Sequence, residues 1–153
     1  MKHLQIFILL LLSTSGFAQN QPEDDKVKKV VTDFFEAFHQ QDSLALRELA
    51  HPNVIMQSVS TNPAGETKVV TVDYGNFLKS IVSIPASTKF EEKLHSFDVT
   101  MNGSLATIVT PFSFYLNGNL SHCGVNSFTM VKEAEEWKIV HIIDTRIKEG
   151  CKE

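Results

Sequence analysis

The sequence has few cysteines, no extended basic run and no closely spaced set of metal ligands. Its 153 residues include only two cysteines, Cys123 and Cys151, and the formal net charge is −4. The longest run of basic residues is the pair Lys28 and Lys29, so a nucleic-acid-binding surface is not predicted. His122 is adjacent to Cys123, but a zinc site needs a second closely spaced pair of ligands. We therefore predict no bound metal.

The apolar run at the N-terminus is too short to span a membrane, which needs roughly 20 residues. A short basic start, Met1 to His3, precedes this run from Leu4 to Leu12, and a small-residue exit ends at Ala18. No cysteine follows the expected cleavage point, which disfavours a lipid anchor. We predict a signal peptide over residues 1–18, cleavage after Ala18, and export to the periplasm or medium without a stable membrane anchor.

The remaining chain has the length of one domain. Residues 19–25 form a short polar leader, and residues 26–149 are expected to share one core. In an oxidising compartment, two cysteines most simply form one disulfide. A bond between Cys123 and Cys151 would close a loop of about 28 residues. Two unpaired thiols are the alternative.

Three helices are predicted in the first half of the domain. Apolar residues between positions 27 and 38 recur at helical spacing, with Asp24 or Asp25 as the cap. The polar segment 40–43 supplies caps for a short second helix. Asp73 is expected to cap the third helix. The spacing of the apolar residues indicates that the first helix lies on a sheet.

The second half is predicted to be an antiparallel meander. Two Asn-Gly dipeptides, at 102–103 and 117–118, supply the positive φ angles of tight hairpin turns. The apolar phase slips between Leu94 and Phe97, and Pro111 lies mid-strand, so the sheet should bend there. A strongly curved sheet would enclose a cavity beside the helices. After a hairpin formed by 54–60 and 67–72, the expected strands lie near 88–101, 104–116, 119–132 and 137–147.

This order of elements, with a final strand that begins Trp-Lys-Ile-Val-His at 137–141, resembles the nuclear transport factor 2-like superfamily. The resemblance covers residues 26–148 and implies a cone-shaped α+β fold, in which N-terminal helices pack on a strongly curved, mainly antiparallel sheet. The segments 121–125 and 144–146 resemble those of exported bacterial members labelled lumazine-binding or polyketide-cyclase-like. The superfamily contains ketosteroid isomerases, scytalone dehydratase, limonene epoxide hydrolase and non-catalytic binding modules. Its fold alone therefore decides no chemistry.

His141 is the first candidate for a functional side chain. In a regular strand it shares a face with Trp137 and Ile139, where burial can shift its pKa and a ligand can contact it. A core histidine with one hydrogen bond is the alternative. The same regularity places Asp144 and Arg146 on the opposite face, as an ion pair at a dimer interface or at the cavity mouth. If the pair is buried, Arg146 becomes an anchor for a carboxylate or a carbonyl-rich ring.

The neighbouring strand supplies further candidates. A four-residue loop at 133–136 would place Phe128 opposite His141 and Asn126 on the same face, which gives a wall of apolar and polar groups. Tyr74 can donate a hydrogen bond to an enolate-like oxygen, with an amphipathic rim position as the alternative.

The orientation of Glu92 and Asp98 is left undetermined by the phase slip. The sequence consequently places no carboxylate base in the cavity.

The sequence favours an exported protein that binds a small flat or hydrophobic molecule in the cone. A cofactor-free isomerase, dehydratase or cyclase that uses His141 for acid/base chemistry is the alternative. A dimerisation module without a ligand is a third possibility, and a homodimer is expected. No cofactor and no nucleic-acid partner are predicted. The predicted ligand-binding residues are His141, Trp137, Phe128, Asn126, Tyr74 and Arg146.

Overall fold

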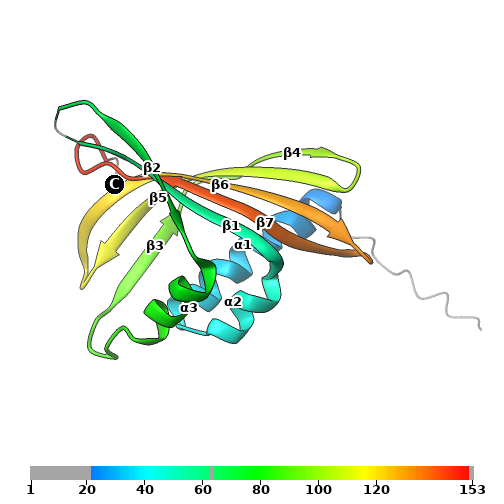
Figure 1. Cartoon of the computed structure of the whole chain (residues 1–153), viewed down its shortest axis with the longest axis horizontal. Helices are drawn as coiled ribbons and strands as arrows, with labels where there is room; N and C mark the ends of the chain where they lie inside the picture. The colour runs from blue at the N-terminus through cyan, green and yellow to red at the C-terminus, as the bar shows by residue number, and fades with distance from the viewer. Residues whose placement is uncertain (1–21, 63, 152–153) are drawn as a thin grey trace, which may run out of the picture.

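The computed structural model describes residues 22–62 and 64–151. The predicted signal peptide and the first residues of the leader lie outside them. Three helices lie on one side of a curved sheet of seven strands (Figure 1). The elements are α1 (Glu23–His39), α2 (Ser43–Leu49), β1 (Ala50–Thr61), β2 (Thr67–Val72), α3 (Tyr74–Val82), β3 (Phe90–Leu94), β4 (Asp98–Asn102), β5 (Leu105–Leu116), β6 (Asn119–Glu133) and β7 (Glu136–Thr145).

The sheet is mainly antiparallel, as predicted. Its strand order is β2-β1-β7-β6-β5-β3, with β4 also paired to β5. Only the pairing of β1 with β7 is parallel among the described strands. The predicted α+β class and the cone-shaped arrangement are therefore confirmed.

Side-chain caps define the starts of two helices. Asp42 accepts hydrogen bonds from the backbone N–H groups of Leu44 and Ala45 at the start of α2, and Asp73 accepts one from Asn76 at the start of α3. The predicted cap of α1 is wrong. That helix begins at Glu23, directly after Pro22, and has no side-chain cap. Its acidic first turn instead lies at the positive end of the helix dipole.

The predicted strand 88–101 is divided into β3 and β4. Its break at residues 95–97 falls where the apolar phase slips. β4 pairs with β5 only as far as Val109, and β3 pairs with β5 from Phe112 onward. Pro111 lies between these two ladders. The absence of its N–H group therefore removes no hydrogen bond from either of them.

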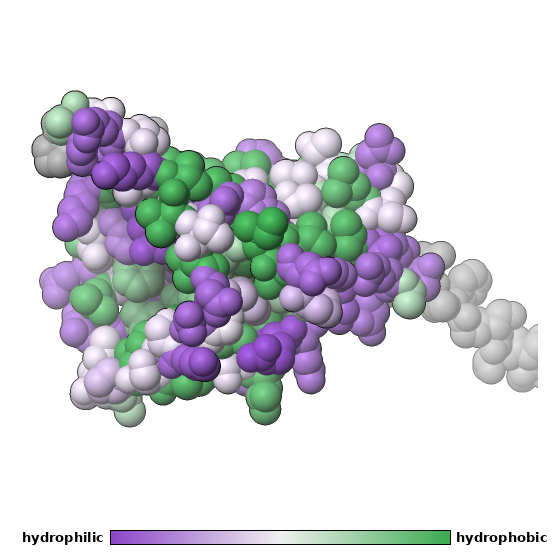
Figure 2. All heavy atoms as spheres, in the orientation of Figure 1, coloured by the Kyte–Doolittle hydropathy of each residue, from purple (hydrophilic) through white to green (hydrophobic). Residues whose placement is uncertain are grey.

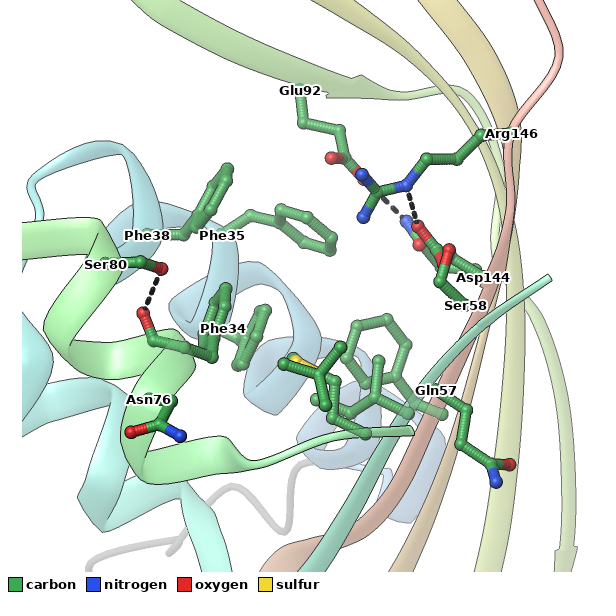
Figure 3. Close-up of a pocket in the computed structure, with 16 residues that line it drawn as sticks. Phe34, Phe35, Phe38, Gln57, Ser58, Asn76, Ser80, Glu92, Asp144 and Arg146 are labelled. Atoms are coloured by element: carbon green, nitrogen blue, oxygen red, sulfur yellow. Dashed lines mark hydrogen bonds and ion pairs between the residues drawn. The ribbon is translucent and has the colours of Figure 1, made fainter. Parts of the chain in front are cut away.

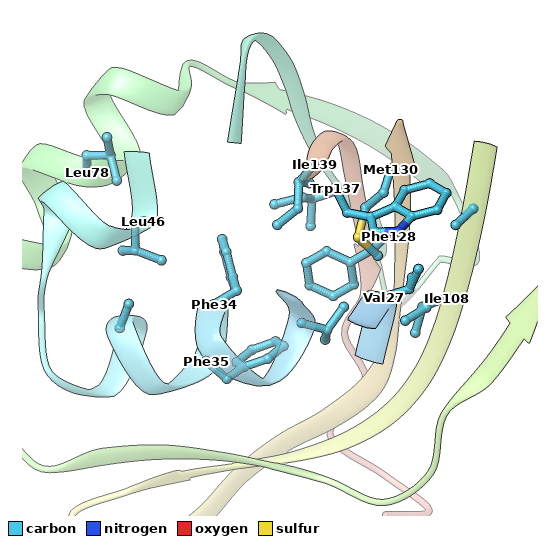
Figure 4. Close-up of a cluster of buried hydrophobic side chains, with 14 of the residues drawn as sticks. Val27, Phe34, Phe35, Leu46, Leu78, Ile108, Phe128, Met130, Trp137 and Ile139 are labelled. Atoms are coloured by element: carbon cyan, nitrogen blue, oxygen red, sulfur yellow. The ribbon is translucent and has the colours of Figure 1, made fainter. Parts of the chain in front are cut away.

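The hydrophobic core fills the space between α1 and the sheet (Figure 4). Val27, Val31 and Phe34 of α1 are almost completely buried, as are Phe128 and Ile139 of the sheet. The ring of Phe128 meets that of Phe34 edge to face, with ring centroids 5.5 Å apart. Because the apolar side chains of α1 and of the sheet cover one another, the apolar area that they remove from water stabilises both layers.

A bulge in β7 changes which side chains face the helices. Met130 of β6 pairs with Ile139, whereas the preceding Thr129 pairs with His141, so Val140 is an extra residue. A bulge shifts the alternation of a strand by one position. Trp137 and Ile139 are buried before it, and Ile142 is buried after it. The prediction of one regular strand over 137–147 is therefore wrong.

The predicted disulfide between Cys123 and Cys151 is present, with Cα atoms 5.6 Å apart. Cys123 and Ile147 also exchange two backbone hydrogen bonds of 3.0 and 2.8 Å. The chain after β7 is thus fixed to β6 by covalent and backbone bonds.

Residues 22–62 and 64–151 contain three α-helices. No helix there is long and apolar enough to cross a membrane. The same residues contain no group of three or more His, Cys, Asp or Glu side chains that could hold a metal ion.

Candidate functional site

A cavity of about 400 Å³ lies between α1, α3 and the concave face of the sheet (Figure 3). Phe34, Phe35 and Phe38 of α1 and Phe77 of α3 supply aromatic side chains to its wall. The rings of Phe38 and Phe77 are nearly parallel, with centroids 6.2 Å apart. Small-molecule sites of this size are typically lined by aromatic groups with a few polar ones.

Glu92 is a partly buried carboxyl group at the polar end of the cavity. Its Oε1 atom accepts a hydrogen bond of 2.7 Å from Nδ2 of Asn126. Burial is the main reason that the pKa of Glu92 is raised to about 7, and the charge of Asp144 acts in the same direction. The hydrogen bond from Asn126 and the charge of Arg146 partly oppose this rise in pKa. Glu92 can therefore both accept and release a proton near neutral pH.

The backbone of Glu92 is also held in place. Its N–H group donates a hydrogen bond of 2.8 Å to Nε2 of His39, so this nitrogen carries no proton. Burial correspondingly lowers the pKa of His39. Bonds from the α1 end and from β6 thus orient the carboxyl group toward the cavity.

Asp144 and Arg146 form an ion pair beside Glu92. The Nε atom of Arg146 donates to Oδ2 of Asp144 at 2.7 Å. The Asp144 side chain is only 12% exposed, whereas that of Arg146 is 58% exposed. The second carboxylate oxygen of Asp144, Oδ1, is buried and has no hydrogen-bond partner among the described residues. Buried polar atoms are usually paired, so this oxygen lacks the donor that such an atom normally has, at a residue that lines the cavity.

Three of the six predicted ligand-binding residues line the cavity: Asn126, Phe128 and Arg146. Arg146 and Asp144 reach it because the β7 bulge turns them toward the helices (Figure 3). They lie on the face opposite His141, as predicted, and of the two predicted locations, a dimer interface or the cavity mouth, the structure shows the cavity.

His141 does not line this cavity. Its Nε2 atom is 3.1 Å from Oε1 of Gln57, and the amide of Gln57 points away from the cavity (Figure 3). The predicted alignment of His141 with Trp137 and opposite Phe128 is also wrong, because Phe128 pairs with Ile142.

The remaining two candidates make structural contacts. Trp137 is buried in the core, and its Nε1 atom donates to Oε2 of Glu23 at 3.1 Å. The hydroxyl group of Tyr74 donates to the backbone oxygen of Leu46 at 2.8 Å. Burial raises the pKa of Tyr74 further above its ordinary value, so this phenol stays protonated. Neither residue lines the cavity described here.

The sequence pattern leaves the facing of Glu92 open and places Asp144 either at a dimer interface or at the cavity mouth. The break between β3 and β4 has a sequence signal, the phase slip between Leu94 and Phe97, but that signal does not say which way Glu92 faces. The β7 bulge, which sets the position of Asp144, has no such signal. The aromatic side of α1 had a signal, since its phenylalanines recur at helical spacing. That signal indicated packing on a sheet, but it did not indicate that some of the rings face a cavity.

Comparisons with known proteins agree with this architecture. The sequence model of the SnoaL-like domain matches residues 27–143. No curated protein matches the sequence significantly.

Solved structures with the same fold come from several bacteria. An NTF2-like protein from Cytophaga hutchinsonii is 14% identical, with a TM-score of 0.65 over 83% of this chain and 100% of that one. A protein of unknown function from Mycobacterium tuberculosis is 9% identical, with a TM-score of 0.66 over 85% of this chain and 78% of that one. An NTF2-like family protein from Streptomyces avermitilis, provisionally named a dehydratase, is 19% identical, with a TM-score of 0.59 over 84% and 99%. At these identities the comparisons establish the fold alone.

Proposed function

Since this chain belongs to the SnoaL-like family of the NTF2-like superfamily, we propose that it binds a small flat or hydrophobic molecule in the cavity between sheet and helices. The observation that carries this proposal is the aromatic cavity of about 400 Å³ with a polar group of Glu92, Asn126, Asp144 and Arg146 at one end. An apolar wall supplies affinity, and a few polar groups fix orientation. An open cavity also argues against a dimerisation module whose cone is filled by its own side chains.

A pair of serine variants tests this function. Ser58 lines the cavity, and Ser60 lies two positions further along β1, is exposed and does not line it. Ser58→Trp should block uptake of a neutral fluorescent probe such as Nile red, while Ser60→Trp should retain it. Equal probe affinity in both variants and the wild type would place the binding elsewhere and contradict the proposal. Circular dichroism controls for folding.

Glu92 favours a second function, cofactor-free acid/base catalysis. A carboxyl group with a pKa of about 7 is matched to proton transfer at neutral pH. In this role Glu92 takes the place that the sequence analysis gave to His141. It would remove a proton from carbon beside a carbonyl group and return it, and Arg146 would stabilise the negative charge on the oxygen.

Deuterium exchange into cyclic ketones in D₂O, followed by proton NMR, tests this second function without a known substrate. The wild type should accelerate exchange for at least one ketone, and Glu92→Gln should remove the acceleration. Asp98→Asn is the matched control, because Asp98 is exposed and does not line the cavity. Acceleration that survives in Glu92→Gln would exclude Glu92 as the base.

We also propose that the protein is exported and forms a homodimer. Support for export comes from the pattern of residues 1–18 and from the disulfide, since disulfides persist in oxidising compartments. Support for the dimer comes from the half-exposed apolar side chains of Ile55 and Val69, which lie on the same face of β1 and β2. Figure 2 shows hydrophobic side chains along the middle of the face in view. Native mass spectrometry of the protein from periplasm or medium tests both proposals: a chain that begins before Gln19 contradicts cleavage, and a monomer contradicts the dimer.

A further inference from the structure

We infer that the cavity selects an aromatic ligand with a hydrogen-bond donor as its head group, an amine or a hydroxyl, over a ligand with an anionic head group. This inference rests on the proposed small-molecule-binding function and names the class of ligand. Its starting point is Oδ1 of Asp144, which is buried and has no hydrogen-bond partner among the described residues. A buried acceptor without a donor carries an uncompensated loss of hydration. A ligand N–H or O–H group would remove that cost.

The charges at the polar end disfavour an anion. Arg146 is already paired with Asp144 at 2.7 Å, and more than half of its side chain is exposed to water. Its positive charge is therefore both compensated and screened. An anionic head group would also meet the carboxylate of Asp144 and the carboxyl group of Glu92, both of which line the same cavity. Arg146 alone consequently gives little preference for a carboxylate ligand.

The opposite wall favours an aromatic body. Phe34, Phe35, Phe38 and Phe77 all line the cavity, and the ring centroids of Phe35 and Phe38 are 6.1 Å apart at a near-perpendicular angle. Aromatic rings in this geometry offer edges and faces to a further ring. A cationic amine gains an additional attraction to such faces. The volume of about 400 Å³ suits a body of one or two fused rings.

The test measures four probes that share one naphthalene body. Their side chains end in an amine (2-naphthylethylamine), a hydroxyl (2-naphthylethanol), a carboxylate (2-naphthylacetate) and no polar group (2-ethylnaphthalene). Competition against Nile red at pH 7 gives each dissociation constant. At least one of the two donor probes, the amine or the alcohol, should bind at least about tenfold more tightly than both the carboxylate and ethylnaphthalene. One added charge-assisted or buried hydrogen bond has an effect of this size. The tighter of the two probes identifies the preferred donor.

An Asp144→Asn variant assigns the preference to this side chain. The substitution keeps the shape and removes the charge, so the affinity for the amine should fall about tenfold and that for ethylnaphthalene should not change. Asp98→Asn removes one charge from an exposed carboxylate outside the cavity and should leave all four affinities unchanged. If Asp144→Asn fails to fold, the wild-type probe series decides alone.

The outcomes separate this inference from the function on which it rests. Tightest binding of the carboxylate, or binding of ethylnaphthalene as tight as that of both donor probes, overturns the inference and leaves the binding function standing. An unchanged amine affinity in folded Asp144→Asn also overturns the inference. Failure of all four probes and of Nile red to bind overturns the inference and the proposed function together.

Discussion

Replacement of Glu92 with glutamine tests the burial of this carboxyl group through its effect on stability. Burial and the neighbouring Asp144 raise the pKa from the ordinary 4.5 to about 7 in the folded protein. The folded chain therefore binds this proton more tightly than the unfolded chain does. The stability due to the proton is fully present below pH 4.5 and is lost as the pH rises to about 7.

The size of the effect follows from the same two pKa values. The difference between 4.5 and about 7 corresponds to about 3 kcal/mol of unfolding free energy, at roughly 1.4 kcal/mol per pH unit. Glutamine has nearly the same shape, carries no charge, and retains an oxygen that can accept the hydrogen bond from Asn126. The variant and the wild type should thus be about equally stable at pH 4.5, and the variant should be more stable by up to about 3 kcal/mol at pH 8.

Urea unfolding, followed by the fluorescence of the single tryptophan, measures this difference at intervals from pH 4.5 to 8. Other titrating groups contribute equally to both proteins, so they cancel in the difference between the two. A difference that stays constant over this range would refute the reasoning, because it would mean that Glu92 titrates alike in the folded and unfolded chains. Asp98→Asn, at an exposed position outside the cavity, is the control for loss of a carboxylate.

Three further substitutions test other features of the structure. Cys151→Ser should lower the unfolding free energy by about 3 kcal/mol relative to the oxidised wild type, and equal urea midpoints in oxidising buffer would contradict a stabilising disulfide. Gly124→Ala should destabilise the protein by at least about 1 kcal/mol, because a Cβ atom there would overlap the backbone oxygen of Thr145; an unchanged thermal midpoint would refute this overlap. His141→Ala should leave the affinity for Nile red unchanged, since His141 does not line the cavity and contacts the amide of Gln57, which points away from the cavity (Figure 3). A marked loss of affinity in a folded variant would contradict its position.

The sequence was sufficient to predict most elements of the fold. Helical spacing, the caps at Asp42 and Asp73, and the Asn117-Gly118 turn are local signals that act within a few residues. At the other Asn-Gly dipeptide only Gly103 has the predicted positive φ, because Asn102 is the last residue of β4. The register of β6 with β7 also began as predicted, with Lys132 opposite Trp137. These features depend on short-range backbone preferences, which a single sequence displays directly.

The site was predicted less completely because it depends on interruptions of the strands. The extra residue Val140 moves His141 out of the cavity and moves Asp144 and Arg146 into it. A bulge is decided by competition between whole registers across two neighbouring strands. Val140 lies in an apolar run with no glycine or proline to mark the interruption.

The β7 bulge divides one strand into two parts that can change separately. Before Val140, the inward side chains of Trp137 and Ile139 belong to the core, and substitutions there alter folding. After it, Ile142 and Asp144 belong to the cavity wall. Specificity for a new ligand could thus be selected or engineered in the second part of the strand without repacking the first.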